Sequence, residues 1–212
     1  MAASRAFSGT VGRWGAGYRV PVTAPTTSRP AGSAGPERVV LLDAEHQPSG
    51  TALKSDVHDT DTALHLAFSS YVTDGEGRVL LTRRALGKRT WPGVWTNTCC
   101  GHPQPGESFD DAVRRRMVDE LGLEVGELTC ALPDFAYRAV DASGVVENEV
   151  CPVFVARTHP GSSVTANASE VMEWRWVEWS SLAASVRATP FAFSPWSVLQ
   201  VPLLDRQASS WV

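Results

Sequence analysis

The chain has 212 residues, of which 43% are hydrophobic and 20% are charged. This length and composition suit one globular domain, and no run of 18 apolar residues suggests a membrane-spanning helix. The net charge of −4 is uneven, because residues 1–36 carry four arginines and no lysine or acidic residue, which leaves −8 on the rest. Such an acidic body argues against a nucleic-acid-binding protein, which needs a broad basic surface.

The first 36 residues are rich in Ala, Gly, Ser, Thr, Pro and Arg, and their apolar residues follow no sustained period. Such a segment cannot bury enough surface to offset its ordering entropy, so we expect a disordered arm before a single domain over residues 37–212. Its composition also matches an organelle transit peptide, although Trp14, Tyr18 and the prolines weaken that interpretation. Because it has no continuous apolar core of the secretory type, we expect a cytoplasmic protein.

Strand-like and helix-like segments alternate imperfectly along the body. Apolar and β-branched runs bounded by turn residues predict strands at 38–43, 65–73, 79–83, 128–140, 145–157 and 173–179. The turn residues 74–77 predict a hairpin between the second and third of these. Residues 44–63 are polar and turn-rich, and residues 87–107 form a long Gly- and Pro-rich loop of the kind that often carries function.

Three helices are expected in the second half of the chain. Ser108 can cap the first, Gly122 can end it, and apolar residues recur between them at helical spacing. Two shorter helices are predicted over 180–187 and 195–207, and Pro202 is expected to interrupt the second. This mixture predicts an α/β (α+β) fold with a mixed sheet flanked by helices.

Glu147 and Glu149 form an acidic pair in a segment that otherwise reads as a core strand. Side chains alternate along a strand, so both carboxylates should point to the same face. There they repel each other, and a cation between them relieves the repulsion. The alternative is an exposed edge strand, with which Pro152 is consistent.

Three of the five histidines could join this acidic pair around a divalent cation. Together they form a mixed nitrogen and oxygen ligand set of His58, His65, His102, Glu147 and Glu149. The spacing matches no zinc finger, and spacing alone favours surface or core positions for these histidines. His46 in a polar turn and His159 before a Pro-Gly-Ser-Ser loop are not candidates.

Four cysteines are present, and we expect reduced thiols. In an extended backbone Cys100 and His102 share one face, whereas Cys99 points to the opposite side. A neighbouring positive charge would make the Cys100 thiol reactive, while apolar burial would leave it inert. Cys130 and Cys151 are expected to be small core residues.

Basic residues gather near the long loop and on the first predicted helix. The loop is preceded and entered by Arg83, Arg84, Lys88 and Arg89. Such a cluster could serve a phosphate-bearing ligand, or it could simply be solvated. Arg116 and Glu120 are neighbours at i and i+4, an arrangement that also occurs as a surface ion pair of little energy.

Part of this region resembles a degenerate Nudix box. The usual pattern is G-x5-E-x7-R-E-U-x-E-E-x-G-U, where U is a bulky aliphatic residue, and its carboxylates hold the Mg²⁺ used to hydrolyse a diphosphate. The matching stretch contains Gly101, Glu107 and the run 115–123. Arg116 and Asp119 stand where the box has glutamates, which should weaken a hydrolytic metal cluster.

Further motifs, which span roughly residues 38–205, resemble the type 1 isopentenyl-diphosphate delta-isomerase family within the Nudix superfamily. The matching stretches are His65–Ser70, Thr82–Leu86, Trp91–Asn97, Cys100–Gln104, Asp134–Ala139, Gly144–Phe154 and Thr189–Trp196. The resemblance implies a Nudix-type sandwich fold and an isomerase of isoprenoid biosynthesis. That enzyme would interconvert isopentenyl diphosphate and dimethylallyl diphosphate by moving one C=C bond.

The resemblance also implies roles for individual residues. Cys100 and Glu149 would act as acid and base on opposite faces of the substrate, Tyr137 would bond the glutamate, and Trp196 would stabilise a carbocation. One divalent ion, Mn²⁺, Zn²⁺ or Mg²⁺, would be bound by His58, His65, His102, Glu147 and Glu149. A second ion, Mg²⁺, would accompany the diphosphate and contact Glu120 and the Cys100 carbonyl.

The implied ligand is a small prenyl diphosphate. Its diphosphate would be bound by Lys54, Arg84, Lys88 and Arg116. No nucleic acid or membrane partner is expected, and the chain is expected to be a monomer or a weak homodimer.

Two other functions stay open on these residues. A Nudix hydrolase of a diphosphate substrate would share the fold and Mg²⁺ but would release phosphate; Arg116 argues against it. A non-enzymatic zinc-stabilised binding module would use Cys99, Cys100, His102 and others in a closed four-ligand site and would unfold on chelation. The acidic pair and the irregular spacing fit that module poorly.

Overall fold

The structure is a computed structural model that describes residues 36–159 and 161–208. The arm predicted at residues 1–36 therefore lies outside the described residues, apart from Pro36. Two β-sheets and four α-helices are found in the described part. None of these helices has the length and apolar character that crossing a membrane requires.

Both sheets contain parallel and antiparallel pairs. The first has the order β2 (Pro48–Leu53), β1 (Arg38–Leu42), β3 (His65–Leu66), β10 (Val146–Val150), β9 (Ala136–Val140). The second has the order β12 (Val171–Glu178), β5 (Arg78–Arg84), β4 (Phe68–Thr73), β11 (Val153–Thr158), β8 (Val125–Leu132). Two short strands extend the second sheet, where β6 (Trp95–Thr96) pairs with β5 and β7 (Cys99–Gly101) pairs with β4. The pairs β3–β10 and β4–β11 are parallel.

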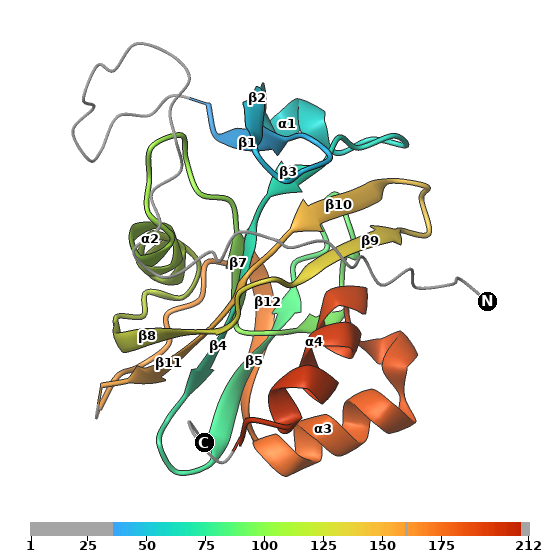
Figure 1. Ribbon diagram of the computed structural model, residues 1–212. Helices are drawn as coiled ribbons and strands as arrows, with labels where there is room; N and C mark the ends of the chain where they lie inside the picture. The colour runs from blue at the N-terminus through green and yellow to red at the C-terminus, as the bar shows by residue number, and fades with distance from the viewer. Residues whose placement is uncertain (1–35, 160, 209–212) are drawn as a thin grey trace.

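Helices cover both faces of the second sheet (Figure 1). The helical elements are α1 (Lys54–Val57), α2 (Phe109–Leu121), α3 (Trp179–Ala188), η1 (Pro190–Ala192) and α4 (Pro195–Asp205). The α2 helix shares a core with Val72 and Leu80, whereas α3 and α4 share another core with Tyr71 and Val79. Because neighbouring strand residues point to opposite faces, the two cores lie on opposite sides of this sheet.

The α2 helix begins and ends where the sequence predicts. Ser108 Oγ accepts a hydrogen bond from the Asp111 backbone nitrogen at 3.1 Å. Gly122 adopts a φ of 58°, a left-handed conformation that glycine adopts without strain, and its N–H donates to Val118 O. Between these caps, Phe109 and Met117 are fully buried. Local capping and a helical apolar period therefore define this element.

The two longest core segments bend from one sheet into the other. The predicted strand 65–73 is divided at Ala67 into β3 and β4, and the predicted strand 145–157 is divided before Pro152 into β10 and β11. Since β3 pairs with β10 and β4 pairs with β11, the two segments run side by side through both sheets. Most residues on both sides of each bend are buried, and no Gly or turn motif marks Ala67, so the sequence pattern contains no sign of the first bend.

Two other predicted boundaries differ from the structure. The predicted strand 128–140 contains a turn after Leu132 that separates β8 from β9. The predicted turn region 44–63 contains β2 and α1. The β2 strand is polar and forms by pairing with β1, a tertiary contact that local composition does not report.

Two prolines behave differently from the prediction. The edge-strand interpretation of Pro152 is wrong, because β10 lies between β3 and β9 and Pro152 lies in the bend that follows it. Pro202 does not interrupt α4, which continues to Asp205. The buried side chains of Val201 and Leu204 hold this part of α4 against the core, although proline removes one helical N–H donor.

Candidate active site

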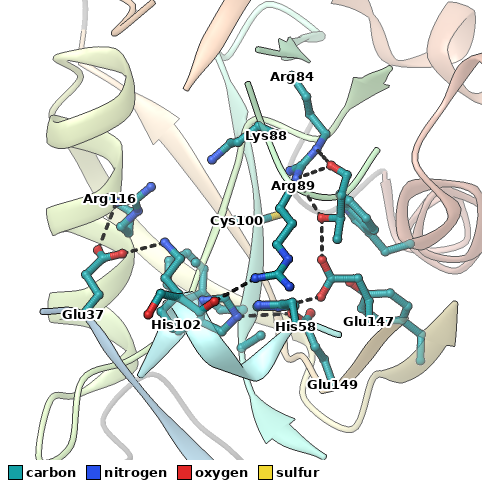
Figure 2. A pocket seen from close by; sticks show the side chains of 18 of the residues that line it. Glu37, His58, Arg84, Lys88, Arg89, Cys100, His102, Arg116, Glu147 and Glu149 are labelled. Carbon is teal, nitrogen blue, oxygen red and sulfur yellow. Dashed lines mark hydrogen bonds and ion pairs between the residues drawn. The ribbon is translucent and has the colours of Figure 1, made fainter. Parts of the chain in front are cut away.

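Residues of both sheets line a cavity of about 600 Å³ (Figure 2). Most of the predicted site residues line it: Lys54, His58, Arg84, Lys88, Cys100, His102, Arg116, Tyr137, Glu147, Glu149 and Trp196. Glu149 belongs to the first sheet and Cys100 to the second, so the candidate acid–base groups approach from different sheets. The other two predicted residues, His65 and Glu120, are buried against lining residues.

Three histidines and a glutamate form a compact cluster at the cavity, and Figure 2 shows three of the four, His58, His102 and Glu149. One ligand atom from each of His58, His65, His102 and Glu149 lies within 4.8 Å of the others. The ring centroid of His65 is 5.0 Å from that of His58 and 5.2 Å from that of His102. Two nitrogen ligands of one tetrahedral zinc ion are about 3.4 Å apart, so the cluster is slightly wider than a closed metal site.

Buried polar atoms in this cluster fit a bound cation. His65 Nδ1 lies 2.9 Å from the Ala63 carbonyl, which requires an N–H on Nδ1 and leaves the Nε2 lone pair free. His65 Nε2 and Glu147 Oε2 are both buried and make no hydrogen bond. Burial lowers the pKa of His102 to about 3, so its ring is neutral at pH 7, the form that binds a metal.

Glu149 is the centre of this cluster. Its Oε1 lies 3.3 Å from His102 Nε2 and 3.4 Å from His65 Nε2. Burial acts to raise the pKa of Glu149, but the interactions with both imidazoles outweigh it and hold the pKa well below the usual value. The carboxylate is therefore ionised at neutral pH and able to accept a proton or bind a cation.

Glu147 lies beside the cluster but is not one of its four closely spaced residues. Its Oε2 is 3.0 Å from His58 Nε2, and its Oε1 accepts a hydrogen bond from Thr90 Oγ1 at 2.7 Å. Thr90 Oγ1 also accepts from Arg84 Nη2 at 3.2 Å. Thr90, which the sequence does not single out, thus connects a metal-site carboxylate to a candidate diphosphate-binding arginine.

The adjacent cysteines point in opposite directions. Cys100 lines the cavity, whereas Cys99 is buried in the core that contains α2. Cys100 Sγ donates to Asn97 Oδ1 at 3.1 Å and lies 3.5 Å from Ser69 Oγ. Burial raises the pKa of the Cys100 thiol to about 11, so the thiol is protonated at neutral pH.

Aromatic rings surround one part of the cavity. The Trp196 ring centroid is 5.8 Å from that of Tyr137 and 5.6 Å from that of Trp91. The Arg84 guanidinium carbon lies 5.2 Å from the Trp196 ring centroid, so this ring already has a cationic neighbour. Tyr137 lies directly across from Glu149 on the neighbouring strand.

Arg116 forms a buried ion pair rather than a surface pair. Arg116 and Glu120 are each only 6% exposed, and Arg116 Nη2 lies 2.5 Å from Glu120 Oε1. Burial acts to lower the pKa of the Arg116 guanidinium, but the charge of Glu120 raises it above the usual value. The side chain is therefore a permanent positive charge at the wall of the cavity.

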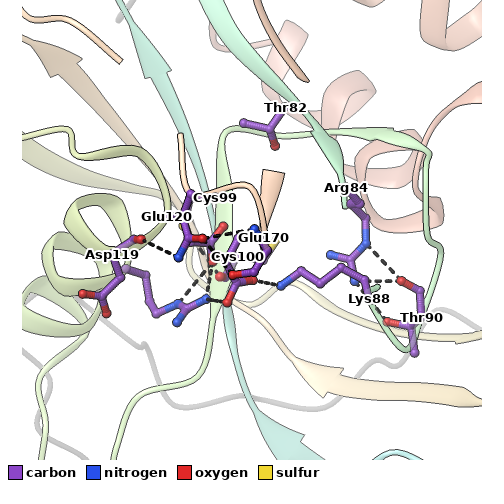
Figure 3. Close-up of polar contacts among 12 residues, drawn as sticks. Thr82, Arg84, Lys88, Thr90, Cys99, Cys100, Asp119, Glu120 and Glu170 are labelled. Atoms are coloured by element: carbon purple, nitrogen blue, oxygen red, sulfur yellow. Dashed lines mark hydrogen bonds and ion pairs between the residues drawn. The ribbon is translucent and has the colours of Figure 1, made fainter. Parts of the chain in front are cut away.

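The two candidate lysines are also paired with carboxylates, and Figure 3 shows the pair of Lys88 with Glu170. Lys54 Nζ lies 2.7 Å from Glu37 Oε2, and Lys88 Nζ pairs with Glu170 Oε2. Glu170 Oε1 also lies 3.2 Å from Arg116 Nη2, so one carboxylate connects two of the cations. No local motif marks Glu37 or Glu170, because long-range packing brings each of them to its partner.

A family model described as NUDIX domain matches residues 63–197. A relative from Frankia alni named isopentenyl-diphosphate Delta-isomerase is 58% identical over 172 residues, which cover 81% of this chain and 88% of the relative. A relative from Kocuria rhizophila with the same name is 61% identical over 161 residues, which cover 76% of this chain and 88% of the relative.

Solved structures show the same fold at low sequence identity. DR0079 from Deinococcus radiodurans has a TM-score of 0.60 and 18% identity, with coverage of 78% of this chain and 98% of that one. A MutT protein from Methanosarcina mazei Go1 has a TM-score of 0.50 and 18% identity, with coverage of 68% and 94%. These likenesses confirm the predicted Nudix-type fold, in which helices flank mixed sheets.

Proposed function

The chain belongs to the isopentenyl-diphosphate Delta-isomerases of the NUDIX domain family, and we propose how its residues perform that isomerisation. The reaction moves a double bond by one carbon between isopentenyl diphosphate and dimethylallyl diphosphate. One proton is added to the alkene and another is removed from the neighbouring CH₂ group, so two acid–base groups suffice. The single observation that supports the assignment best is that Cys100 and Glu149 line one cavity from two different sheets.

Cys100 and Glu149 are the proposed acid–base pair. In one direction the Cys100 thiol gives its proton to the alkene while the Glu149 carboxylate removes one from the CH₂ group; the roles are exchanged in the other direction. The protonated thiol and the ionised carboxylate at neutral pH support this pairing of one acid with one base. The number of protons on enzyme plus substrate is the same before and after each turnover.

Protonation of an alkene creates a carbocation that the protein must stabilise. We assign this to the ring face of Trp196, because a desolvated aromatic ring can stabilise a cation by about 2 kcal/mol. Tyr137, across from Glu149 on the next strand, is proposed to orient that carboxylate. Burial of Trp196 to 3% exposure also supports a site from which water is excluded.

One divalent ion is proposed for the histidine and glutamate cluster. Its ligands would be His58, His65, His102, Glu147 and Glu149. When bound, such an ion supplies positive charge that tunes the proton affinity of Glu149. Three imidazoles combined with carboxylates suit Mn²⁺ or Zn²⁺, and Mg²⁺ remains a third candidate.

The diphosphate is proposed to lie at the basic part of the cavity. Its ligands would be Lys54, Arg84, Lys88 and Arg116. We propose that Glu120 and the Cys100 carbonyl would help to hold a Mg²⁺ that accompanies the substrate diphosphate and would supply positive charge to it. Arg116 stands where a hydrolytic Nudix box has an acidic residue, and a fixed cation there would bind the diphosphate and leave it intact.

The products of one incubation test the proposed function. Purified protein is supplied with isopentenyl diphosphate and Mg²⁺, and both dimethylallyl diphosphate and free phosphate are measured. We expect dimethylallyl diphosphate without released phosphate. Phosphate release would instead favour a diphosphate hydrolase, and unfolding on chelation with neither product would favour a zinc-stabilised binding module.

Removal of residues 1–35 is expected to leave the isomerase active. Pro36 and Glu37 line the cavity, so the truncated chain should begin at Pro36 and keep the pair between Glu37 and Lys54. The isomerisation rate and KM should stay within about twofold of the full chain. A loss of more than tenfold would assign the arm a part in the site.

We further propose that the protein works in the cytoplasm as a monomer or weak homodimer.

A further inference from the structure

Asn97 lies between β6 and β7 and connects two residues of the proposed mechanism. It is fully buried, and its Oδ1 accepts three hydrogen bonds. The donors are Cys100 Sγ at 3.1 Å, Trp196 Nε1 at 2.8 Å and Thr96 Oγ1 at 2.7 Å. One carbonyl oxygen thus contacts both the acid–base thiol and the indole ring that faces the carbocation.

The orientation of the Asn97 amide is fixed by its other end. Its Nδ2 donates to the Ser70 carbonyl at 3.1 Å and to the Cys99 carbonyl at 2.8 Å. A flipped amide would place its oxygen against these two carbonyl oxygens and its NH₂ group against the indole N–H. In the unflipped orientation every neighbouring donor and acceptor has a partner on the Asn97 amide, so the direction of Oδ1 is fixed.

The backbone of Asn97 is held equally firmly. Its N–H donates to Ser197 Oγ at 3.1 Å, and its carbonyl accepts from Thr82 Oγ1 at 2.9 Å. Ser197 belongs to the same helix, α4, as Trp196. Asn97 therefore joins β5, β7 and α4, the elements that deliver the arginine, thiol and indole to the cavity.

We propose that Asn97 is a positioning residue that sets the directions of the Cys100 thiol and the Trp196 indole through one shared oxygen. This inference rests on the proposed function, because it assumes that both side chains act on the substrate. Among the described residues, Cys100 Sγ is hydrogen-bonded to Asn97 Oδ1 and Ser69 Oγ, so loss of Asn97 Oδ1 leaves only the 3.5 Å contact with Ser69. The indole N–H of Trp196 then becomes a buried donor without an acceptor. A displacement of about 1 Å at a reacting group can reduce a rate about 10²-fold.

The test is a double-mutant cycle with Asn97→Leu and Trp196→Phe. Trp196→Phe keeps an aromatic face but removes the indole N–H, so it breaks the same contact from the other side. Each single variant should lower kcat by about 10- to 10²-fold and change KM by less than about threefold. The kcat of the double variant should be only slightly lower than that of Asn97→Leu, because the bond from the indole N–H that Trp196→Phe removes is already lost in Asn97→Leu.

Thr98→Val is the matched control. Thr98 is also fully buried, and its Oγ1 accepts from Val72 N and donates to the Leu80 carbonyl, so its hydroxyl is hydrogen-bonded to neither Cys100 nor Trp196. We expect this control to lower the melting temperature while kcat stays within about twofold of the parent protein. Bound metal and melting temperature are measured for every variant, so that a folding defect is separated from a positioning defect.

Several outcomes would overturn the inference. A kcat within twofold of the parent for Asn97→Leu, or a double-mutant loss equal to the product of the single losses, contradicts a shared contact. If Asn97→Leu does not fold, Trp196→Phe decides alone, and an unchanged kcat overturns the role at the indole. None of these three results would contradict the proposed function as long as Cys100→Ala has lost its activity.

Discussion

Replacing Cys100 by alanine should reduce isomerisation by about 10²- to 10⁴-fold, the usual contribution of one acid–base group. The variant should stay folded, because Cys100 lines a cavity and is not part of the tightly packed core around α2. The measurement is the rate of dimethylallyl diphosphate formation at saturating isopentenyl diphosphate, together with the melting temperature.

Cys99→Ala is the matched control for this experiment. The two cysteines are adjacent in sequence, but Cys99 points into the core and is only 2% exposed. Its replacement should cost some stability and leave the rate of isomerisation nearly unchanged. A Cys100→Ala variant with near-normal turnover would refute the proposed mechanism.

Removal of the clustered metal ligands should have the second largest effect. We expect purified protein to hold about one tightly bound divalent ion per chain, and His65→Ala combined with His102→Ala to lose it. Elemental analysis of dialysed protein gives the metal content, and the isomerisation assay gives the loss of activity. Both histidines lie within 3.4 Å of Glu149, so their loss also removes the groups that hold this carboxylate in its ionised form.

His159→Ala controls for the general effect of removing a histidine. His159 is exposed and is not among the four clustered residues, so metal content and activity should not change. Full isomerase activity in protein shown by elemental analysis to be metal-free would contradict a metal site in this cluster.

Local signals predict some elements well, and α2 is the best example. Its helical apolar period, its Ser108 cap and its Gly122 end are all encoded within 15 residues, and each is found in the structure. The hairpin of β4 and β5 is likewise encoded in the turn between them. The division of 65–73 between two sheets is not encoded locally, since both halves are buried and no turn residue separates them.

Some residues of the site are likewise indicated by the sequence, and others are brought to it only by tertiary packing. The spacing of His65 and His102 matches no known metal motif, so their candidacy rests on a possible cation site with the acidic pair and on the family resemblance. The structure brings them together at Glu149, which His65 approaches from β3 and His102 from just after β7. Asn97 ends one of the matching stretches and Thr90 lies just before it, but nothing in the sequence indicates their roles, because the tertiary fold determines what they contact.

The shared bend of the two core segments determines the spacing of the site. Glu149 lies just before the bend in one sheet, and Cys100 pairs with Ser69 just after it in the other. The width between the two reactive groups is therefore a property of the backbone rather than of side-chain conformation. One residue inserted at Ala67 would turn the side chains of β4 to the opposite faces of the sheet. The same insertion after Thr158, at the end of β11, would leave the site unchanged. Chain length at the bend is thus constrained as strictly as the identity of the reactive side chains.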